Sequence, residues 1–418
     1  MAKYTRLRGT TDFIPPQSEI LRSTENKITE TIKTFGFREI ITPTLERKAL
    51  FTRSIGETTD IVEKEMFSFK DKGGREVVLR PEGTAPVVRA YVEEGIYGRQ
   101  KFVRYFYRGS FFRYEKPQAG REREFHQIGV EVLGCRSPYL DAEIIYLGVK
   151  ILETLAIKDF TLELGSVGCL QDRKAFVEKL KVSLGNRVDL LCKDCKRRTE
   201  QNPLRIFDCK VKECRKLAEH LPSLLDNLCN DCKNHLHKVE NTLKELHVRY
   251  HLHPHLVRGL DYYTGITFEF QHNLLGAQNT ILAGGRYDNL VEEIGGAYTP
   301  ACGFALGLER ILLALKEEGK TPADRNGIQA FACYVSEKEF LPAFCLTQEL
   351  RKRGITSDLD YSGKNLKHQL KSANRVKAKY SVILGEDEIK EGKVLLKNMD
   401  TGEQKLLSKE EAIEIIKQ

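Results

Sequence analysis

The chain has 418 residues, a length that predicts two to three domains, each large enough for its own hydrophobic core. An apolar content of 41 % and a charged content of 30 % are typical of a soluble globular enzyme. The net charge of +8 is compatible with a polyanionic partner but does not require one. Because no apolar run approaches ~18 residues and the first residues lack the apolar core of a signal peptide, we expect a cytoplasmic protein with no membrane partner.

The first predicted elements are a helix and a strand. Residues 18–35 have apolar side chains at the spacing of an amphipathic helix, which Gly36 ends. Residues 37–45 predict a strand that contains a proline, and this composition favours an edge or interface position. An ordinary edge strand is sufficient to explain these residues on their own.

A carboxylate stands at the end of the next predicted strand. Residues 76–84 run as a strand into a Pro-Glu-Gly-Thr turn that holds Glu82 and Thr84, and a helix follows from Ala85. A carboxylate at such a turn is well placed to bind the ammonium group of a ligand. The alternative is a helix-capping residue whose side chain is solvated.

A hairpin of two strands is predicted for residues 105–134, with an unusual set of polar side chains. On its first strand, the alternation places Arg113 and Glu115 on one face. On its second strand, Gln127 and Glu131 share a face around a glycine, which a strand interior normally avoids unless something approaches closely. The structural alternative is an ion-paired hairpin.

The hairpin carries a family resemblance. Its segment Phe112-Arg113-Tyr114-Glu115 resembles the second motif of class II aminoacyl-tRNA synthetases, and the continuation KPQAGREREFHQIGVEVLG resembles the histidyl-tRNA synthetase version. The resemblance implies an α+β catalytic domain with an antiparallel sheet, a helical insertion and a C-terminal α/β anticodon-binding domain. It implies ATP-dependent attachment of L-histidine to tRNA(His) through a histidyl-adenylate, with Mg2+ accompanying ATP. It also implies a homodimer. The helix and strand of residues 18–45 resemble the first class II motif, which forms the dimer interface in the family.

A cysteine-rich stretch follows the hairpin. Residues 167–250 are rich in Lys and Arg, have a helical pattern and predict an insertion between catalytic strands. Two of its three cysteine pairs, Cys192/Cys195 and Cys229/Cys232, can together form a four-thiolate zinc site, although the gap between them exceeds the usual ~15–20 residues. Free buried cysteines in a reducing cytosol are the alternative, and the family needs no metal here. The three pairs are Cys192/Cys195, Cys209/Cys214 and Cys229/Cys232.

Two strings beyond the insertion resemble the histidine-binding strings of the same family. The first is RGLDYYTG, within the β-rich residues 256–270. The second is AGGRYD, residues 283–288, where glycines let the backbone approach a ligand closely. The adjacent Tyr262 and Tyr263 of the first string, taken alone, are explained equally well by core packing.

Residues 301–316 predict a strand that turns into a helix. One helix face is an apolar stripe, and another places small residues around Arg310. Such spacing leaves room for a group against the guanidinium, and a surface arginine is the alternative. The string GFALGLERILLAL resembles the third class II motif, whose arginine contacts ATP. The nearby Gly-Lys-Thr of residues 319–321 is not a P-loop, because a helix precedes it.

The last part of the chain predicts a separate domain. Residues 321–327 are a linker by composition, and residues 328–418 alternate strands and helices in an α/β domain that resembles the family's anticodon-binding domain. Its second helix, within 364–377, carries a row of basic side chains on one face. A solvated face is the default interpretation, but a tRNA-handling domain upstream favours phosphate contact. We therefore expect a catalytic domain over 1–322 that contains the insertion.

The resemblance assigns site residues position by position. Arg113 and Arg258 are expected to act in catalysis, contacting the α-phosphate and the histidine carboxylate from two sides, with no metal held by the protein. The expected ATP-binding residues are Arg113, Glu115, Arg121, Arg123 and Arg310. The expected histidine-binding residues are Glu82, Thr84, Gln127, Glu131, Arg258, Tyr262 and Tyr263, of which Glu131 and Tyr263 meet the ring nitrogens.

One departure and one alternative accompany this assignment. Lys116 stands where many family members carry Arg, in the loop expected near the acceptor end of tRNA. The alternative is the non-catalytic, synthetase-like regulatory subunit of ATP phosphoribosyltransferase. That paralogue typically lacks the anticodon domain and has degraded motifs, whereas Arg113, Arg258 and a full C-terminal domain are present here.

Overall fold

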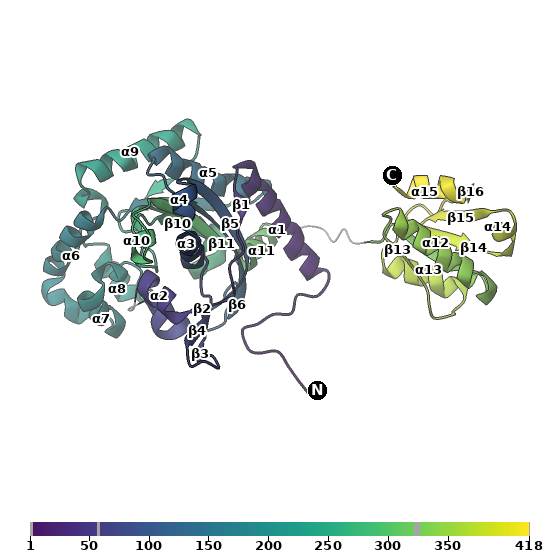
Figure 1. The fold of residues 1–418 in the computed structure, drawn as a ribbon, viewed down its shortest axis with the longest axis horizontal. Helices are drawn as coiled ribbons and strands as arrows, with labels where there is room; N and C mark the ends of the chain where they lie inside the picture. The colour runs from purple at the N-terminus through teal and green to yellow at the C-terminus, as the bar shows by residue number, and fades with distance from the viewer. Residues whose placement is uncertain (1–2, 57–58, 322–326, 418) are drawn as a thin grey trace. The chain divides into compact units, whose positions relative to one another are not determined.

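The protein was examined as a computed structural model, which describes residues 3–56, 59–321 and 327–417. The chain divides into two compact units, Met1–Pro322 and Ala323–Gln418, each built on its own sheet (Figure 1). Among the described residues, no helix combines the length and the apolar character needed to cross a membrane.

An eight-stranded sheet forms the centre of the N-terminal unit. Neighbouring strands are antiparallel except for the outermost pair at each edge, β1 with β5 and β7 with β8, which are parallel. The predicted antiparallel sheet of an α+β domain is therefore confirmed. The spatial order is β1 (Arg38–Glu39), β5 (Val103–Phe112), β6 (Glu124–Leu133), β11 (Ala301–Gly307), β10 (Thr280–Arg286), β9 (Thr264–His272), β7 (Phe160–Ser166) and β8 (His251–Leu252).

Helices cover one face of this sheet and enclose the main hydrophobic core. Val130, Phe304 and Phe268 come from neighbouring or nearby strands and pack here, buried with the apolar faces of the helices. The long helix beneath them begins with Pro138, whose missing N–H costs nothing in the first turn. The covering helices are α1 (Gln17–Thr34), α5 (Pro138–Thr154) and α11 (Leu308–Glu317).

Shorter elements lie against the opposite face. A small sheet with the order β2, β4, β3 leads into helix α3, which contacts β6. The bounds are β2 (Leu45–Arg47), α2 (Lys48–Ile55), β3 (Ser68–Lys70), β4 (Glu76–Leu79), α3 (Thr84–Glu93), α4 (Ile96–Arg99) and α10 (Leu290–Glu293). Strand β4 is followed by α3, and the candidate site begins at the start of this helix.

Between β7 and β8 the chain forms a group of helices with its own small core. Phe176, Leu180 and Ile206 are buried there together with three cysteines. Figure 1 shows these helices side by side at the edge of the unit. They are α6 (Leu170–Leu184), α7 (Lys193–Gln201), α8 (Lys212–Ala218) and α9 (Asn230–Glu245), the last of which packs on α5.

The C-terminal unit is a five-stranded sheet with helices. Strands β13, β12 and β14 are parallel, and β15 and β16 continue the sheet in antiparallel fashion. The predicted alternation of strands and helices is present, with one additional strand, β16, that the sequence did not indicate. The elements are β12 (Ala330–Tyr334), α12 (Phe340–Lys352), β13 (Ser357–Leu359), α13 (Leu366–Arg375), β14 (Tyr380–Leu384), α14 (Glu386–Lys390), β15 (Lys393–Asn398), β16 (Gln404–Ser408) and α15 (Lys409–Lys417).

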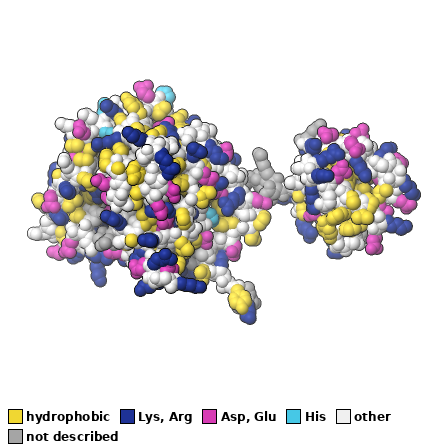
Figure 2. Space-filling model, in the orientation of Figure 1, with side chains coloured by type: hydrophobic (Ala, Val, Ile, Leu, Met, Phe, Trp, Pro, Cys, Tyr) yellow, Lys and Arg dark blue, Asp and Glu magenta, His cyan; other side chains and the backbone are white. Residues whose placement is uncertain are grey.

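Charge is spread over the surface that is in view. Figure 2 shows basic and acidic side chains interspersed on this face of each unit, with hydrophobic side chains scattered between them. The net charge of +8 is therefore not gathered into one field on this face. The candidate site rests on specific buried groups rather than on a general basic surface.

Candidate active site on the central sheet

Three glycines on the face of the sheet toward α3 leave room for side chains that gather there. A Cβ atom at Gly129 would overlap the ring of Tyr107, and one at Gly303 would overlap the carboxylate of Glu131 and approach the hydroxyl of Tyr287 at 2.9 Å. A Cβ at Gly285 would come within 3.0 Å of the ring of Tyr263. The strands are paired so that Glu131 lies opposite Gly303, and Gly303 lies opposite Gly285. We call Gly129, Ala283, Gly285, Gly303 and Ala305 the small-residue patch.

Tyr107 was not predicted as a site residue. It lies on β5 opposite Gly129, and a Cβ at Gly83, just before α3, would also overlap its ring. Its hydroxyl is buried with no hydrogen-bond partner among the described residues, and burial raises the pKa of this tyrosine. The carboxamide oxygen of Gln127, on the same strand face as Glu131, is likewise buried and unpartnered within the described chain. Unpartnered buried polar atoms mark places where a ligand atom is accepted.

Glu131 is a buried acceptor at the centre of this face. Its side chain accepts a hydrogen bond from the Thr84 hydroxyl at 2.7 Å and another from the Tyr287 hydroxyl. Burial raises the pKa of Glu131 to about 8, and no cation pairs with it among the residues that the structure describes. A ligand N–H would therefore find an acceptor that the protein leaves without a positive partner. Tyr287 was also missed, although it lies in the AGGRYD string.

Glu82 and Thr84 lie at the first turn of α3. Both oxygens of Glu82 accept backbone N–H groups, from Thr84 at 2.7 Å and from Ala85 at 2.9 Å. The helix-capping interpretation is thus correct for the contacts, but the side chain is buried rather than solvated. Burial raises the pKa of Glu82. Thr84 touches both carboxylates and links the start of α3 to the sheet.

Arg258 forms a partly buried ion pair with Glu269, a residue that sequence reasoning did not single out. Glu269 lies on β9 and also accepts a hydrogen bond from the Thr280 hydroxyl at 2.9 Å. Burial opposes both charges, but mutual attraction prevails, so the pKa of Arg258 is raised and that of Glu269 is lowered. The Nε of Arg258 has no partner within the described residues. The rings of Tyr262 and Tyr263 follow, 4.8 Å apart.

A group of arginines surrounds Glu115. Arg121 pairs with this carboxylate, and an Nη of Arg113 lies 4.0 Å from it. The predicted place of Arg113 and Glu115 on the strand is wrong, because β5 ends at Phe112 and both residues lie in the segment after it. The N–H of Arg113 still bonds to the carbonyl of Arg123 in the register of the hairpin, but that of Tyr114 bonds to Glu65 of another segment, so the chain leaves the pairing with β6 after Arg113.

Arg310 reaches the same group from α11. It donates to the carbonyl of Gly120 at 3.2 Å and to that of Thr280 at 2.7 Å. Burial, followed by repulsion from Arg121, lowers its pKa to about 10. Arg310 is thus repelled by Arg121 and Arg113, and an anion placed among the three guanidinium groups would relieve their repulsion.

Arg123 has different contacts. Its Nε donates to the carbonyl of Glu115 at 3.3 Å, an Nη donates to that of Arg8 at 3.4 Å, and the guanidinium lies 3.8 Å from the centre of the Tyr114 ring. These contacts order the loop after β5 and the N-terminal segment.

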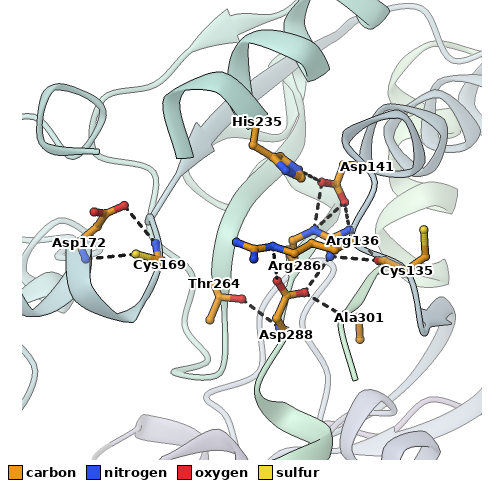
Figure 3. Close-up of polar contacts among 10 residues, drawn as sticks. All are labelled: Cys135, Arg136, Asp141, Cys169, Asp172, His235, Thr264, Arg286, Asp288 and Ala301. Carbon is orange, nitrogen blue, oxygen red and sulfur yellow. Dashed lines mark hydrogen bonds and ion pairs between the residues drawn. The ribbon is translucent and has the colours of Figure 1, made fainter. Parts of the chain in front are cut away.

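Arg286 of the AGGRYD string points away from Glu131. Figure 3 shows it between Asp141 and Asp288, to which it donates at 2.8 Å each, while Asp141 also bonds to His235 at 2.5 Å. A cavity of about 270 Å³ lies beside this network and is lined partly by Cys169 and Tyr298. Arg286 and Tyr287 are adjacent on an extended strand, so their side chains serve opposite faces. The network joins β10 to α5 and is separate from the Glu131 side.

The two CxxC pairs do not meet, so the zinc site considered for them together is excluded. Cys192 and Cys195 lie with Cys209 and Cys214, whereas Cys229 and Cys232 lie with Cys169 and Asp172. The pairs stand at the starts of two different helices, α7 and α9, and this separates them. All eleven cysteines are free thiols.

Comparison with known proteins places this arrangement in a family. The model of the histidyl-tRNA synthetase family matches residues 9–311, and that of an anticodon binding domain matches residues 329–418. The histidine–tRNA ligase of Halothermothrix orenii is 47 % identical over 397 residues, which cover 95 % of this chain and 95 % of that protein. The apo histidyl-tRNA synthetase structure from S. aureus is 35 % identical, with a TM-score of 0.84 over 100 % of both chains.

A more distant structure shares the fold alone. It is described as an ATP phosphoribosyltransferase regulatory subunit/histidyl-tRNA synthetase from Bacillus halodurans, and it is 22 % identical with a TM-score of 0.65. The match covers 92 % of this chain and 98 % of that one. The family-wide matches, by contrast, extend over both units and every motif described above. This chain belongs to the histidyl-tRNA synthetase family.

Proposed function

We propose that this protein attaches L-histidine to tRNA(His) with ATP, through a histidyl-adenylate. The observation that carries the proposal is Glu131, a buried carboxylate without a cation, on the hairpin of β5 and β6 whose connecting segment holds Arg113 and Arg121, the partners of Glu115. One half of this arrangement accepts N–H groups and the other half attracts phosphates. Residues 1–322, with the insertion 167–250, form the catalytic domain in this proposal, and residues 328–418 form the anticodon-binding domain.

Histidine would be recognised through its ring nitrogens. Glu131 accepts one imidazole N–H, and the hydroxyl of Tyr263 meets the other nitrogen, with Tyr262 packed against that ring. An amino acid without these nitrogens would leave the carboxylate buried and unpaired, which can cost a factor of about 10⁴–10⁵ in selectivity. Glu82, together with the unpartnered amide of Gln127, holds the ammonium and carboxylate ends.

The first chemical step joins two anions. A carboxylate oxygen of histidine attacks the α-phosphorus of ATP, and the bond to pyrophosphate breaks. Arg113 and Arg258 stabilise the negative charge that develops on the phosphoryl oxygens, and they are the proposed catalytic residues. Arg310 and Arg121 hold the β- and γ-phosphates, and Arg123 supports them from the loop that it orders.

Mg2+ would accompany the nucleotide. Glu115 lies among the arginines, and burial together with the charge of Glu115 raises the pKa of the nearby Glu65. Two carboxylates that repel one another fit a divalent cation, and these residues would hold it. The ion supplies charge neutralisation on the phosphates.

The second step transfers histidine to tRNA. A ribose hydroxyl of the terminal adenosine attacks the carbonyl carbon of the adenylate, and the bond to AMP breaks. On α13 and beside it, the C-terminal unit exposes a row of basic side chains that would contact tRNA phosphates. They are Lys364, Lys367, Lys371 and Arg375. The proposal includes a homodimer formed through α1 and β1, and a location in the cytoplasm with the tRNA pool.

Histidine-dependent exchange of pyrophosphate into ATP tests the proposal. Wild type is compared with Arg258→Ala and with the control Arg75→Ala, which removes an arginine that pairs with Asp71 on an exposed loop. Exchange with histidine alone, greatly slowed by Arg258→Ala and unchanged by Arg75→Ala, is the expected result. Absence of exchange in a folded protein that binds histidine contradicts the proposal. Binding to a phosphoribosyltransferase catalytic subunit would then be measured.

A further inference from the structure

Four thiols gather at one point in the helical group between β7 and β8. Cys195, Cys209 and Cys214 are buried and Cys192 is half-buried, and their sulfur atoms all lie within 4.8 Å of one another. Cys192 and Cys195 belong to the first turn of α7, Cys214 belongs to α8, and Cys209 lies in the segment between them. We propose that these four cysteines bind a structural Zn2+ ion.

The spacing of the sulfurs suits tetrahedral coordination. A Zn–S bond of about 2.3 Å places the sulfurs of a regular tetrahedron about 3.8 Å apart. The Sγ atoms of Cys192 and Cys209 are 3.9 Å apart. A disulfide would need a separation of about 2.05 Å, and it would join two sulfurs while leaving two. Four thiolates around a single centre account for the whole set.

The backbone already stabilises the metal-binding form of the first ligand. The N–H of Cys195 donates to the sulfur of Cys192 at 3.5 Å, and the N–H of Cys192 donates to the sulfur of Cys214 at 3.2 Å. Backbone N–H groups therefore point at two of the four sulfur atoms, as they would at metal-bound thiolates.

Buried reduced thiols in an ordinary core are the competing explanation. The local core gathers Leu191, Leu204 and Ile206 around the sulfurs, and the helices beside it are short, with 9 residues in α7 and 7 in α8. Helices of this length are marginal without tertiary support, and small cores commonly need a metal or disulfide cross-link. The cysteines stand where such a cross-link would join α7 to α8.

The segment between the second and third ligands contacts the proposed histidine site. Asn202 donates to the carboxylate of Asp261 at 2.8 Å, next to Tyr262, and Arg198 pairs with Asp60 at 3.1 Å. A metal ion would hold this segment in place by both ends. The consequence for histidine binding rests on the proposed function, whereas metal binding itself does not.

The second cluster provides an internal comparison. Cys229 is exposed, and the carboxylate of Asp172 already accepts backbone N–H groups from Cys169 at 3.3 Å and from Cys229 at 3.1 Å. Figure 3 shows Asp172 and Cys169 bonded to each other at the start of α6. A capping box explains this cluster without a metal, so Cys229→Ser is a suitable control.

The test measures metal directly in the purified full chain. Elemental analysis should find one zinc per chain in wild type, in Cys229→Ser and in Cys333→Ser, which alters a buried cysteine of the other unit. Cys209→Ser should lose the zinc. Replacement of zinc by Co2+ should give the visible bands of tetrahedral thiolate coordination in the three zinc-binding proteins, and these bands should be absent from Cys209→Ser. A folded wild type that binds neither Zn2+ nor Co2+ overturns the proposal, as does a cobalt spectrum that depends on Cys229 but not on Cys209.

A second measurement covers the case in which Cys209→Ser does not fold. Wild type is titrated with a thiol reagent before and after a chelator removes the metal, and four additional thiols should react afterwards. Equal reactivity before and after would contradict the proposal. The histidine KM in pyrophosphate exchange should rise several-fold on metal removal while the ATP KM changes little. A chain that binds zinc but shows no pyrophosphate exchange would contradict the proposed function without contradicting the proposed metal site.

Discussion

The hydroxyl of Thr84 donates to Oε1 of Glu131 over 2.7 Å, and this bond joins the first turn of α3 to the middle of the sheet. The backbone N–H of the same threonine donates to Glu82, also at 2.7 Å. Two buried carboxylates are thus organised by one residue, and the charge of Glu82 adds to the burial that raises the pKa of Glu131. The site is built to receive positive or N–H-bearing groups.

Replacement of Glu131 by Gln should abolish selective histidine binding. The amide keeps the size of the side chain, but it carries no charge and offers only one acceptor atom to Thr84, Tyr287 and the ligand. We expect the affinity for histidine, measured by calorimetry, to fall by a factor of about 10² or more. Glu94→Gln, which changes an exposed glutamate, should bind histidine as wild type does. Equal affinities for Glu131→Gln and wild type would remove Glu131 from the histidine site.

The stability of the ligand-free protein should fall with pH because of the same residue. The pKa of Glu131 is about 8 when folded and near the ordinary glutamate value of 4.5 when unfolded, so the folded state binds more protons between these values. The contribution of Glu131 to the free energy of unfolding is complete below about pH 4.5 and is lost as the pH rises through about 8. The free energy of unfolding falls by at most about 1.4 kcal/mol per pH unit over this range.

Urea unfolding of wild type and Glu131→Gln over this pH range checks the expectation. Carboxylates with raised pKa values that do not interact with Glu131, such as Glu293, contribute to both proteins and cancel in the difference. The difference in free energy of unfolding between the two proteins should change steadily with pH. A difference that does not depend on pH would show that Glu131 is already ionised in the folded state.

Loss of the Arg310 guanidinium should weaken ATP binding. This arginine is crowded by Arg121, and a polyphosphate would relieve that repulsion. Arg310→Ala should raise the ATP KM in pyrophosphate exchange by about 10- to 100-fold, as expected for loss of a charge-assisted contact worth about 1.5–3 kcal/mol. Arg310→Lys should recover only part of the loss, because a single ammonium group cannot reproduce both carbonyl bonds. An unchanged histidine affinity in both variants is the internal control.

Gly303→Ala should block the histidine site from within the sheet. The new Cβ would overlap the Glu131 carboxylate and the backbone carbonyl of Val130, and overpacking of this kind costs about 1–3 kcal/mol. We expect a folded protein with a lower melting temperature and no measurable histidine binding. Gly98→Ala is the matched control, since nothing lies within 4 Å of its added Cβ. Normal histidine binding by Gly303→Ala would show that the small-residue patch can adjust to accommodate the added methyl group.

Local patterns predict most of the strands and helices, but not their pairing. The hairpin of β5 and β6 is predictable because alternation and a Pro/Gly turn are properties of neighbouring residues. Tyr107 and Glu269 are not, because their importance depends on the register of β5 with β6 and on the pairing of β9 with β10. The placement of Glu115 also depends on long-range contacts, since the chain leaves the hairpin at Tyr114, whose N–H bonds to Glu65.

The cysteines illustrate the same limit. The shared CxxC motif suggests a common site for Cys192/Cys195 and Cys229/Cys232, even though the gap between them is longer than usual. The fold instead brings Cys209 and Cys214 to the first pair and Cys169 to the last. Which thiols meet is decided by the packing of α6 to α9, and no local pattern in the chain specifies that packing.

The opposite orientations of Arg286 and Tyr287 have a consequence for selectivity. Arg286 is clamped between Asp141 and Asp288 on the far side of the sheet, while Tyr287 bonds to Glu131 on the near side. A rotation of β10 by a few degrees would move the two side chains together. Replacement of Asp141 would free Arg286 and thereby loosen β10 just before Tyr287, without changing any group that contacts Glu131 directly.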